Sequence, residues 1–219
     1  MRKDHTAEDS SSAGEQHGDQ GHRRGWPLWS AVAALVVAAL VGGYALGSPG
    51  YPDDDSPEAG FLRDMSTHHA QAVNMSLLVL EESEDTALRT VAQDIARTQQ
   101  EQIGRMQGWL VQWDLPARGP EPPMSWMPDH DAEGGMPGMA SEERMEKLRT
   151  AEGEDAEIVF LRAMIDHHVG GVDMAEAAEE LGEEPMVVDF AAGMAETQQS
   201  EIEMMREMLS ERGVDPEDM

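Results

Sequence analysis

The sequence predicts an all-α protein whose main domain is a four-helix bundle built from two duplicated helical hairpins. Residues 61–110 align with residues 160–209 at a constant offset of 99 and without a gap. In both segments apolar side chains recur at three- and four-residue steps, which is the period of an amphipathic helix. Ala, Glu, Leu, Met and Gln dominate, and the alternation typical of strands is missing. A gapless repeat of this length indicates one duplicated supersecondary unit, and two helical hairpins make a four-helix bundle.

The N-terminal part of the chain predicts a membrane anchor. Residues 1–25 are polar and rich in Gly and Ser, so we expect a disordered cytoplasmic tail. Residues 26–46 carry no charge, and 21 residues at roughly 1.5 Å each cross a hydrocarbon core of roughly 30 Å. Two arginines precede this run and three aspartates follow it, which places the C-terminal domain outside the cytoplasm. We therefore expect 26–47 to be a single-pass transmembrane helix in the cell membrane, with cleavage after a small-residue motif and secretion as the alternative.

The remaining elements follow in order. A linker at 48–56 leads into the bundle at 57–212, and a short tail follows at 213–219. The bundle divides into repeat one at 57–113, a Met-rich linker with a short helix at 114–152, and repeat two at 153–212. The periodicity predicts first helices at 57–82 and 156–181, and second helices that end near 113 and 212. We expect the Pro/Gly-rich linker to cross or drape along the bundle, and Ser141 to cap the short helix.

The composition excludes several classes of function. The chain has 44 Asp plus Glu against 15 Lys plus Arg, for a formal net charge of −29. A protein this acidic has no basic patch for nucleic acid phosphates, and cations are its natural counterparts. The absence of cysteine excludes disulfides, thiolate metal sites and cysteine nucleophiles. The 17 methionines supply the available sulfur, although a Met-rich core is also explained by flexible packing.

A stripe of His and Met on the first helix of each repeat indicates a metal site. Side chains three, four and seven residues apart share one helix face. The stripe consists of Met65, His68, His69 and Met75 in repeat one, and of Met164, His167, His168 and Met174 in repeat two. Thioether sulfur is a soft ligand that suits Cu(I), and imidazole suits copper as well as zinc. We therefore predict a copper cofactor, with Cu(I) favoured over Cu(II) and zinc as the alternative.

Two further groups of residues accompany this stripe. The second helices carry Gln99, Gln102 and Met106 in repeat one, and Gln198, Glu201 and Met205 in repeat two. A buried amide needs a partner, so we expect Gln99 and Gln198 to orient the imidazoles, with Glu201 as an alternative direct ligand. The linker adds Met124, Met127, His130, Met136 and Met139, which can wrap a soft ion or dock on the bundle.

Two alternatives remain open at this point. Di-iron bundles place a carboxylate three residues before the ligating histidine, whereas this chain has Met65 and Met164 there. This replacement disfavours a metal-dependent oxidase, and we expect no enzymatic activity. In the second alternative, the histidines and methionines are structural residues of a packing or interaction module that binds no metal. The sequence leaves protein partners and oligomeric state undecided.

The repeated motifs resemble the family catalogued as domain of unknown function (DUF) 305. The resemblance rests on M-x-x-H-H-x-x-x-x-x-M at Met65–Met75 and Met164–Met174, and on T-Q-Q-x-x-I-x-x-M at Thr98–Met106 and Thr197–Met205. It covers residues 57–212 and implies a ferritin-like helical bundle. It also implies extracytoplasmic copper binding, buffering or transfer in copper tolerance.

Overall fold

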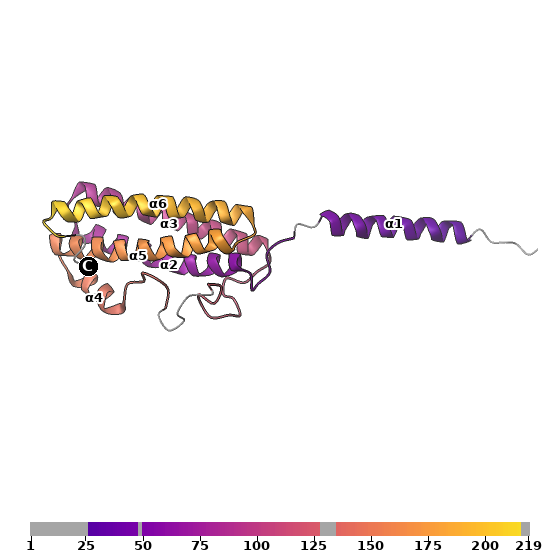
Figure 1. The fold of residues 1–219 in the computed structure, drawn as a ribbon, viewed down its shortest axis with the longest axis horizontal. Coiled ribbons are helices and arrows are strands. Elements are labelled where there is room, and N and C mark those ends of the chain that lie inside the picture. Colours follow the sequence, from indigo (N-terminus) through magenta and orange to yellow (C-terminus); the bar gives the residue numbers. More distant parts are fainter. Residues whose placement is uncertain (1–25, 48–49, 128–134, 216–219) are drawn as a thin grey trace, which may run out of the picture. The chain divides into compact units, whose positions relative to one another are not determined.

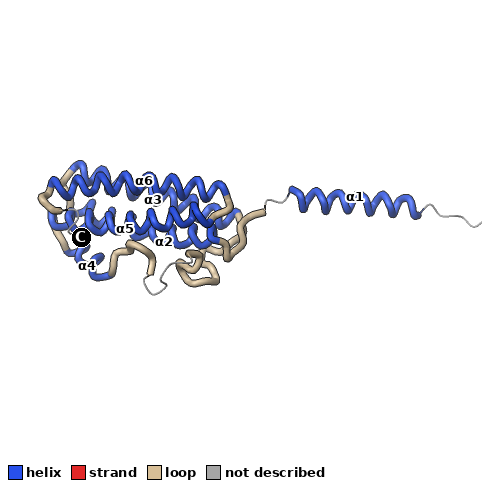
Figure 2. Tube along the Cα trace, viewed as in Figure 1, coloured by secondary structure: helices blue, strands red, loops and turns tan. Residues whose placement is uncertain are grey.

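A computed structural model describes residues 26–47, 50–127 and 135–215. All regular structure in these ranges is helical, which confirms the all-α prediction (Figure 2). The helices are α1 (Trp26–Gly47), α2 (Pro57–Glu82), α3 (Thr86–Gln112), α4 (Glu142–Thr150), α5 (Gly153–Leu181) and α6 (Pro185–Glu211). The chain divides into two compact units, Met1–Gly50 and Tyr51–Met219.

The first unit contains α1, which occupies the range predicted to cross the membrane. Within the ranges that the structure describes, no helix is long and apolar enough to span a bilayer. The helix predicted at 26–47 is present as α1, and its role as a membrane anchor stays a prediction. The predicted tail at 1–25 lies outside the described residues, as do 48–49 of the first linker and 216–219 of the C-terminal tail.

Local side-chain chemistry explains where the helices of the second unit begin. Ser56 caps α2 by accepting a hydrogen bond from the third residue of the helix at 3.2 Å, and Pro57 occupies the first helical position. Asp85 accepts two backbone hydrogen bonds at the start of α3. Ser141 caps α4 through a 3.2 Å bond from Arg144 N, which confirms its predicted role. Helix α5 begins at residue 153, three residues earlier than expected.

Four long helices form the bundle (Figure 1). Helix α2 packs on α3 and α5 packs on α6, which are the two predicted hairpins, and α2 and α5 join the hairpins along one side. Helices α2 and α5 are antiparallel, because Met65 shares a buried cluster with Met174 while Met75 shares another with Met164. Helix α4 lies against α5 and α2. The duplication in sequence is thus a duplication in structure.

The apolar core consists of two clusters that repeat each other. The Phe61 cluster includes Phe61, Leu62, Met65, Met106, Trp126 and Met174. The Phe160 cluster includes Met75, Leu148, Phe160, Met164, Met205 and Leu209. Phe61 and Phe160 occupy equivalent positions of the two repeats and are fully buried. Each cluster draws side chains from both hairpins, so burial of apolar surface holds the repeats together.

The linker between the repeats drapes along the bundle. The amide of Gln71 pairs with the backbone of Ala140, donating to its O at 2.9 Å and accepting from its N at 2.7 Å. Asp64 Oδ2 accepts from Met124 N at 2.7 Å and from Trp126 Nε1 at 3.0 Å. Side chains of α2 therefore hold the linker at two places, near residues 124–126 and at residue 140.

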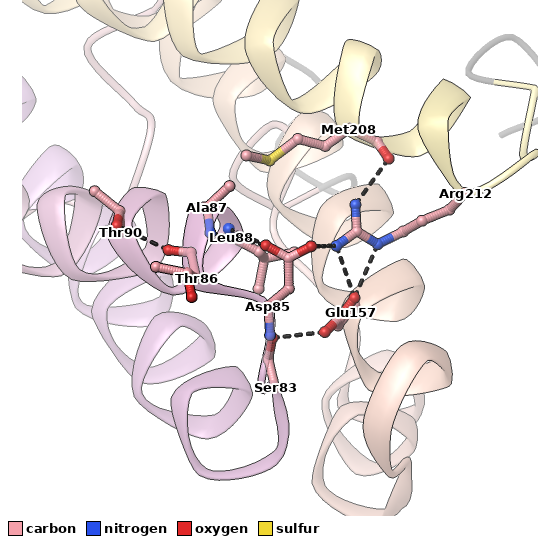
Figure 3. Close-up of polar contacts among 9 residues, drawn as sticks. All are labelled: Ser83, Asp85, Thr86, Ala87, Leu88, Thr90, Glu157, Met208 and Arg212. Carbon is pink, nitrogen blue, oxygen red and sulfur yellow. Dashed lines mark hydrogen bonds and ion pairs between the residues drawn. The ribbon is translucent and has the colours of Figure 1, made fainter.

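A polar clamp ties the hairpin turns to the opposite repeat (Figure 3). Glu157 of α5 accepts from Ser83 Oγ, in the α2–α3 turn, at 2.6 Å and from Arg212 at 2.7 Å and 2.9 Å. Arg212 also pairs with Asp85 at 3.0 Å. At the equivalent position of repeat one, Glu58 accepts from the backbone N of residues 183 and 184 in the α5–α6 turn. Each turn is thus held by a carboxylate of the other repeat.

We expect Arg212→Met to lower the free energy of unfolding by about 3 kcal/mol, because it leaves the Glu157 carboxylate buried without its charged partner. The side chains of Arg212 and Glu157 are only 8 % and 9 % exposed. Urea unfolding followed by circular dichroism measures the change. Arg149→Met is the control, because Arg149 pairs with exposed Glu142 and Glu146 on α4. Equal stability of the two variants would contradict the clamp.

Candidate metal centre

The four histidines of the stripe form one buried layer between the two apolar clusters. His68, His69, His167 and His168 have no solvent-exposed surface. Along α2 the layer lies between Met65 of the Phe61 cluster and Ala72 of the Phe160 cluster. The structure therefore brings together both double-histidine motifs that the sequence singled out.

The centre of the layer is a contact between the two repeats. The rings of His68 and His167 stack with centroids 3.7 Å apart and an angle of 28° between their planes. His167 Nε2 donates to the backbone O of His68 at 3.0 Å. The rings of His69 and His168 lie farther out, at 6.5 Å and 6.2 Å from their sequence neighbours.

Each Nε2 atom of the layer is paired with an oxygen. His68 Nε2 lies 3.0 Å from Pro137 O. His69 Nε2 lies 2.8 Å from Gln102 Oε1, and His168 Nε2 lies 2.8 Å from Glu201 Oε2. Carbonyl and carboxylate oxygens accept hydrogen bonds, so each neutral ring carries its proton on Nε2. The other nitrogen, Nδ1, then presents a lone pair.

These Nδ1 lone pairs are buried and have no hydrogen-bond partner among the described residues in any of the four rings. Leaving a buried polar atom without a partner costs roughly 1–3 kcal/mol. Four such atoms in one layer are therefore expensive for a core whose only task is packing. A neutral imidazole with a bare nitrogen is also the form that binds a metal ion, so the layer fits a metal.

Burial keeps His68, His69 and His167 neutral. Desolvation lowers the pKa of His68 to about 4 and the pKa of His69 to about 3. The pKa of His167 is also well below its ordinary value, chiefly because of burial and then because of the neighbouring His68. At neutral pH a cation therefore does not compete with protons for these three nitrogens.

The orienting residues differ from those that the sequence predicts. Gln102 and Glu201, rather than Gln99 and Gln198, bond the outer imidazoles. Among the described residues, Gln99 Oε1 and both polar atoms of Gln198 have no partner. Gln198 packs on the backbone of Gly171, which lies three residues after His168 on α5. The expectation for Gln99 and Gln198 is wrong because the antiparallel α2–α3 and α5–α6 pairs place each histidine one helical turn further along its partner helix.

Methionine sulfur flanks the histidine layer on both sides. Met65, Met106 and Met174 lie in the Phe61 cluster, and Met75, Met164 and Met205 lie in the Phe160 cluster. All six are fully buried. Within the described part of the chain, no three His, Asp or Glu side chains converge as a metal-binding group.

The linker methionines occupy two kinds of place. Met124 is buried in the Phe61 cluster, and Met127 and Met136 are half-buried against it. Met139 is also half-buried. His130 lies outside the described residues. The structure places these thioethers against the bundle and shows none of them bonded to the four histidines.

The contact of the linker with the histidine layer is a feature that the sequence motifs do not reveal. Pro137 supplies the oxygen that pairs with His68, and its carbonyl lies directly on Gly170. Gly138, at φ +70°, lies on the backbone of Asp166. A side chain at either glycine would collide with backbone. The pair GG at 170–171, where repeat one has QA, is the signal that could have indicated this approach.

Comparison with known proteins identifies the family. The model of the family described as "Domain of unknown function (DUF305)" matches residues 58–209. The chain belongs to the DUF305 family. Comparison with curated proteins gives no match.

Solved structures of DUF305 proteins share this fold. A DUF305 protein from Streptomyces coelicolor is 46 % identical with a TM-score of 0.70, covering 74 % of this chain and 98 % of its own. A DUF305 fragment from Deinococcus radiodurans is 34 % identical with a TM-score of 0.62, covering 75 % and 99 %. CopM in its Cu(II)-bound form is 26 % identical with a TM-score of 0.56, covering 71 % and 97 %. CopM has also been solved in Cu(I)-bound and Ag-bound forms.

We expect the metal-free DUF305 bundle to lose stability as the pH falls from about 6.5 towards 4. His68 and His69 bind protons in the unfolded chain below about 6.5, but in the folded protein only near 4 and 3. The unfolded state therefore binds more protons, and each ring lowers the free energy of unfolding by about 1.4 kcal/mol per pH unit in this window. Urea unfolding at several pH values, with a chelator present, measures the slope.

The control for this pH dependence is His68→Gln/His69→Gln, because many carboxylates titrate in the same window. Subtracting its curve from that of the unaltered protein isolates the two imidazoles. Parallel curves for the two proteins would show that these rings are not held neutral by the fold.

Proposed function

We propose that this protein binds copper in its histidine layer and buffers it or passes it on, without catalysing a reaction. One observation carries this proposal: four buried imidazoles leave their Nδ1 atoms bare between two groups of buried thioethers. Imidazole and thioether together suit copper, and a soft monovalent ion above all. The Cu(I)-, Cu(II)- and Ag-bound forms of CopM, a relative of the same fold, support this choice.

The ligands we propose are the imidazoles and the buried methionines on either side of them. They are Met65, His68, His69 and Met75 with Met164, His167, His168 and Met174, supported by Met106 and Met205. Cu(I) is the favoured form, because each thioether is a soft, neutral donor in an apolar surrounding. Zinc, which prefers nitrogen and oxygen, would use the histidines alone.

The chemistry of the layer favours binding over oxidation. A di-iron oxidase takes carboxylates from all four helices. Of the described residues that hydrogen-bond to the four histidines, only Glu201 is a carboxylate, and its counterpart Gln102 is an amide. Asp64 holds the linker and Asp166 pairs with Arg144, so both nearby aspartates are engaged elsewhere. We therefore propose no enzymatic role.

We further propose that the bundle works outside the cytoplasm, after export that depends on residues 26–47. The uncharged run behind Arg23 and Arg24 is what supports this location. Cell fractionation and N-terminal sequencing of the mature protein would separate an anchored form from a cleaved one. Recovery of the full chain in the cytosol would overturn this location.

We expect replacement of Met65, Met106, Met164 and Met205 by Leu to weaken Ag(I) binding at least tenfold while leaving Zn(II) binding little changed. Leu matches Met in volume and usually costs under about 1.5 kcal/mol per site, so the fold is retained. Competition titrations measure the affinities, and X-ray absorption detects sulfur around the bound ion. Unchanged Ag(I) affinity would exclude the thioethers as ligands.

Replacing His68, His69, His167 and His168 by Ala tests the proposal as a whole. We expect copper stoichiometry to fall while the helical circular dichroism spectrum persists. The matched control replaces Met186 and Met204, two half-exposed methionines of α6, by Leu, which should leave stoichiometry unchanged. If the histidine variant keeps the copper stoichiometry of the unaltered protein, the metal-binding function is wrong.

A further inference from the structure

We propose that the two repeats form unequal metal sites, and that Glu201 makes the His168 side the tighter one for a divalent cation. This proposal rests on the metal-binding function proposed above and adds an order of loading to it. Its basis is one difference between His69 and His168, the matched pair of histidines in the layer.

The matched geometry comes from the duplication. His69 and His168 occupy equivalent positions, are both fully buried, and both have an Nδ1 atom without a partner. Each Nε2 lies 2.8 Å from a side-chain oxygen at the equivalent position of the second helix. In repeat one this oxygen belongs to the amide of Gln102, and in repeat two it belongs to the carboxylate of Glu201. The two histidines thus share the same hydrogen-bond distance, the same burial and the same bonded nitrogen. They differ in the charge of the side chain that accepts the hydrogen bond.

The surroundings leave this charge difference uncancelled. The side chain of Glu201 is 16 % exposed, so water screens it only in part. Among the described residues, no Arg or Lys forms an ion pair with it. In repeat one, Arg105 lies one turn after Gln102, but Glu101 pairs with it at 2.6 Å. The equivalent positions in repeat two are Ser200 and Met204, which are neutral. Over these three pairs of positions, Glu201 therefore carries the net difference in charge.

A carboxylate behind the imidazole changes how the ring binds a metal ion. Coordination through Nδ1 draws electron density from the ring and makes the Nε2 proton more acidic. A carboxylate accepting that proton's hydrogen bond stabilises the shift more than an amide does, and it raises the basicity of the ligand. Partners of this kind typically change metal affinity by roughly 10–100-fold. Glu201 thus acts as a positioning residue that tunes His168.

The effect depends on the charge of the ion. Coulomb attraction between Glu201 and a bound cation is twice as large for a divalent as for a monovalent ion at the same place. The preference for the His168 side, on a logarithmic scale, should therefore be about half as large for Ag(I) as for Cu(II). A divalent ion fills the His168 side first, whereas monovalent ions divide more evenly between the two sides.

Stepwise titration of the full chain with Cu(II), and separately with Ag(I), tests this proposal at one fixed pH. The variants are Glu201→Gln, Gln102→Glu and the double exchange. In each variant, residues 102 and 201 both keep a side-chain oxygen that accepts the hydrogen bond from the Nε2 of the facing histidine. We expect Glu201→Gln to weaken the first Cu(II) step roughly 10–100-fold and to bring the two steps together. We expect Gln102→Glu to strengthen the second step.

The double exchange is the decisive variant. It should restore the difference in affinity between the two Cu(II) binding steps, and the first ion should now bind on the His69 side. Paramagnetic broadening of the His69 and His168 ring signals, after one equivalent of Cu(II), identifies which side is loaded. Equal affinities in the unaltered protein and in Glu201→Gln, or loading of the His168 side in the double exchange, would overturn the proposal. A chain that binds neither ion would instead refute the metal-binding function itself.

Discussion

The contact between His68 and His167 is the constraint on which the rest of the structure depends. It stacks two rings at 3.7 Å where α2 meets α5, in the middle of an otherwise apolar interface. Two aromatic rings in this arrangement pack well, yet each keeps a nitrogen without a partner. The burial of apolar side chains from both hairpins, in the clusters on either side, offsets the free-energy cost of these unpaired nitrogens. The Phe61 and Phe160 clusters therefore stabilise the bundle, and the histidine layer between them keeps nitrogen atoms that can bind a ligand.

The linker makes the symmetry of the two repeats incomplete. His167 bonds the backbone of His68, whereas His68 bonds Pro137 of the linker instead of the backbone of His167. This substitution requires Gly170, because only a residue without a side chain lets Pro137 come so close. The linker thus covers the α2 and α5 side of the layer (Figure 1). Together with the exchange of Gln102 for Glu201, it gives two halves of one sequence different environments.

The sequence was sufficient for the helices, the duplication and the histidine layer, because these depend on periodic and repeated residues. It predicted Ser141 as a cap, since a capping contact is local. It failed for Gln99 and Gln198, because the face of a helix follows from spacing but the register between two helices does not. It also gave no sign that Asp64 and Gln71 anchor the linker, since those partners are 60 and 69 residues away. The helix predicted at 26–47 is present, while its role as an anchor stays a prediction.

The reciprocal clamps at the hairpin turns have a consequence for the origin of the fold. Glu157 holds the turn of the first hairpin, and Glu58 holds the turn of the second. A hairpin on its own would therefore lack the carboxylate that secures its turn and would leave its own carboxylate unsatisfied. Two identical hairpins would satisfy each other only as a twofold pair, with both clamps exchanged between subunits. The present chain has the arrangement expected of such a homodimer after gene fusion, and the linker between its halves forms part of the wall around the histidines.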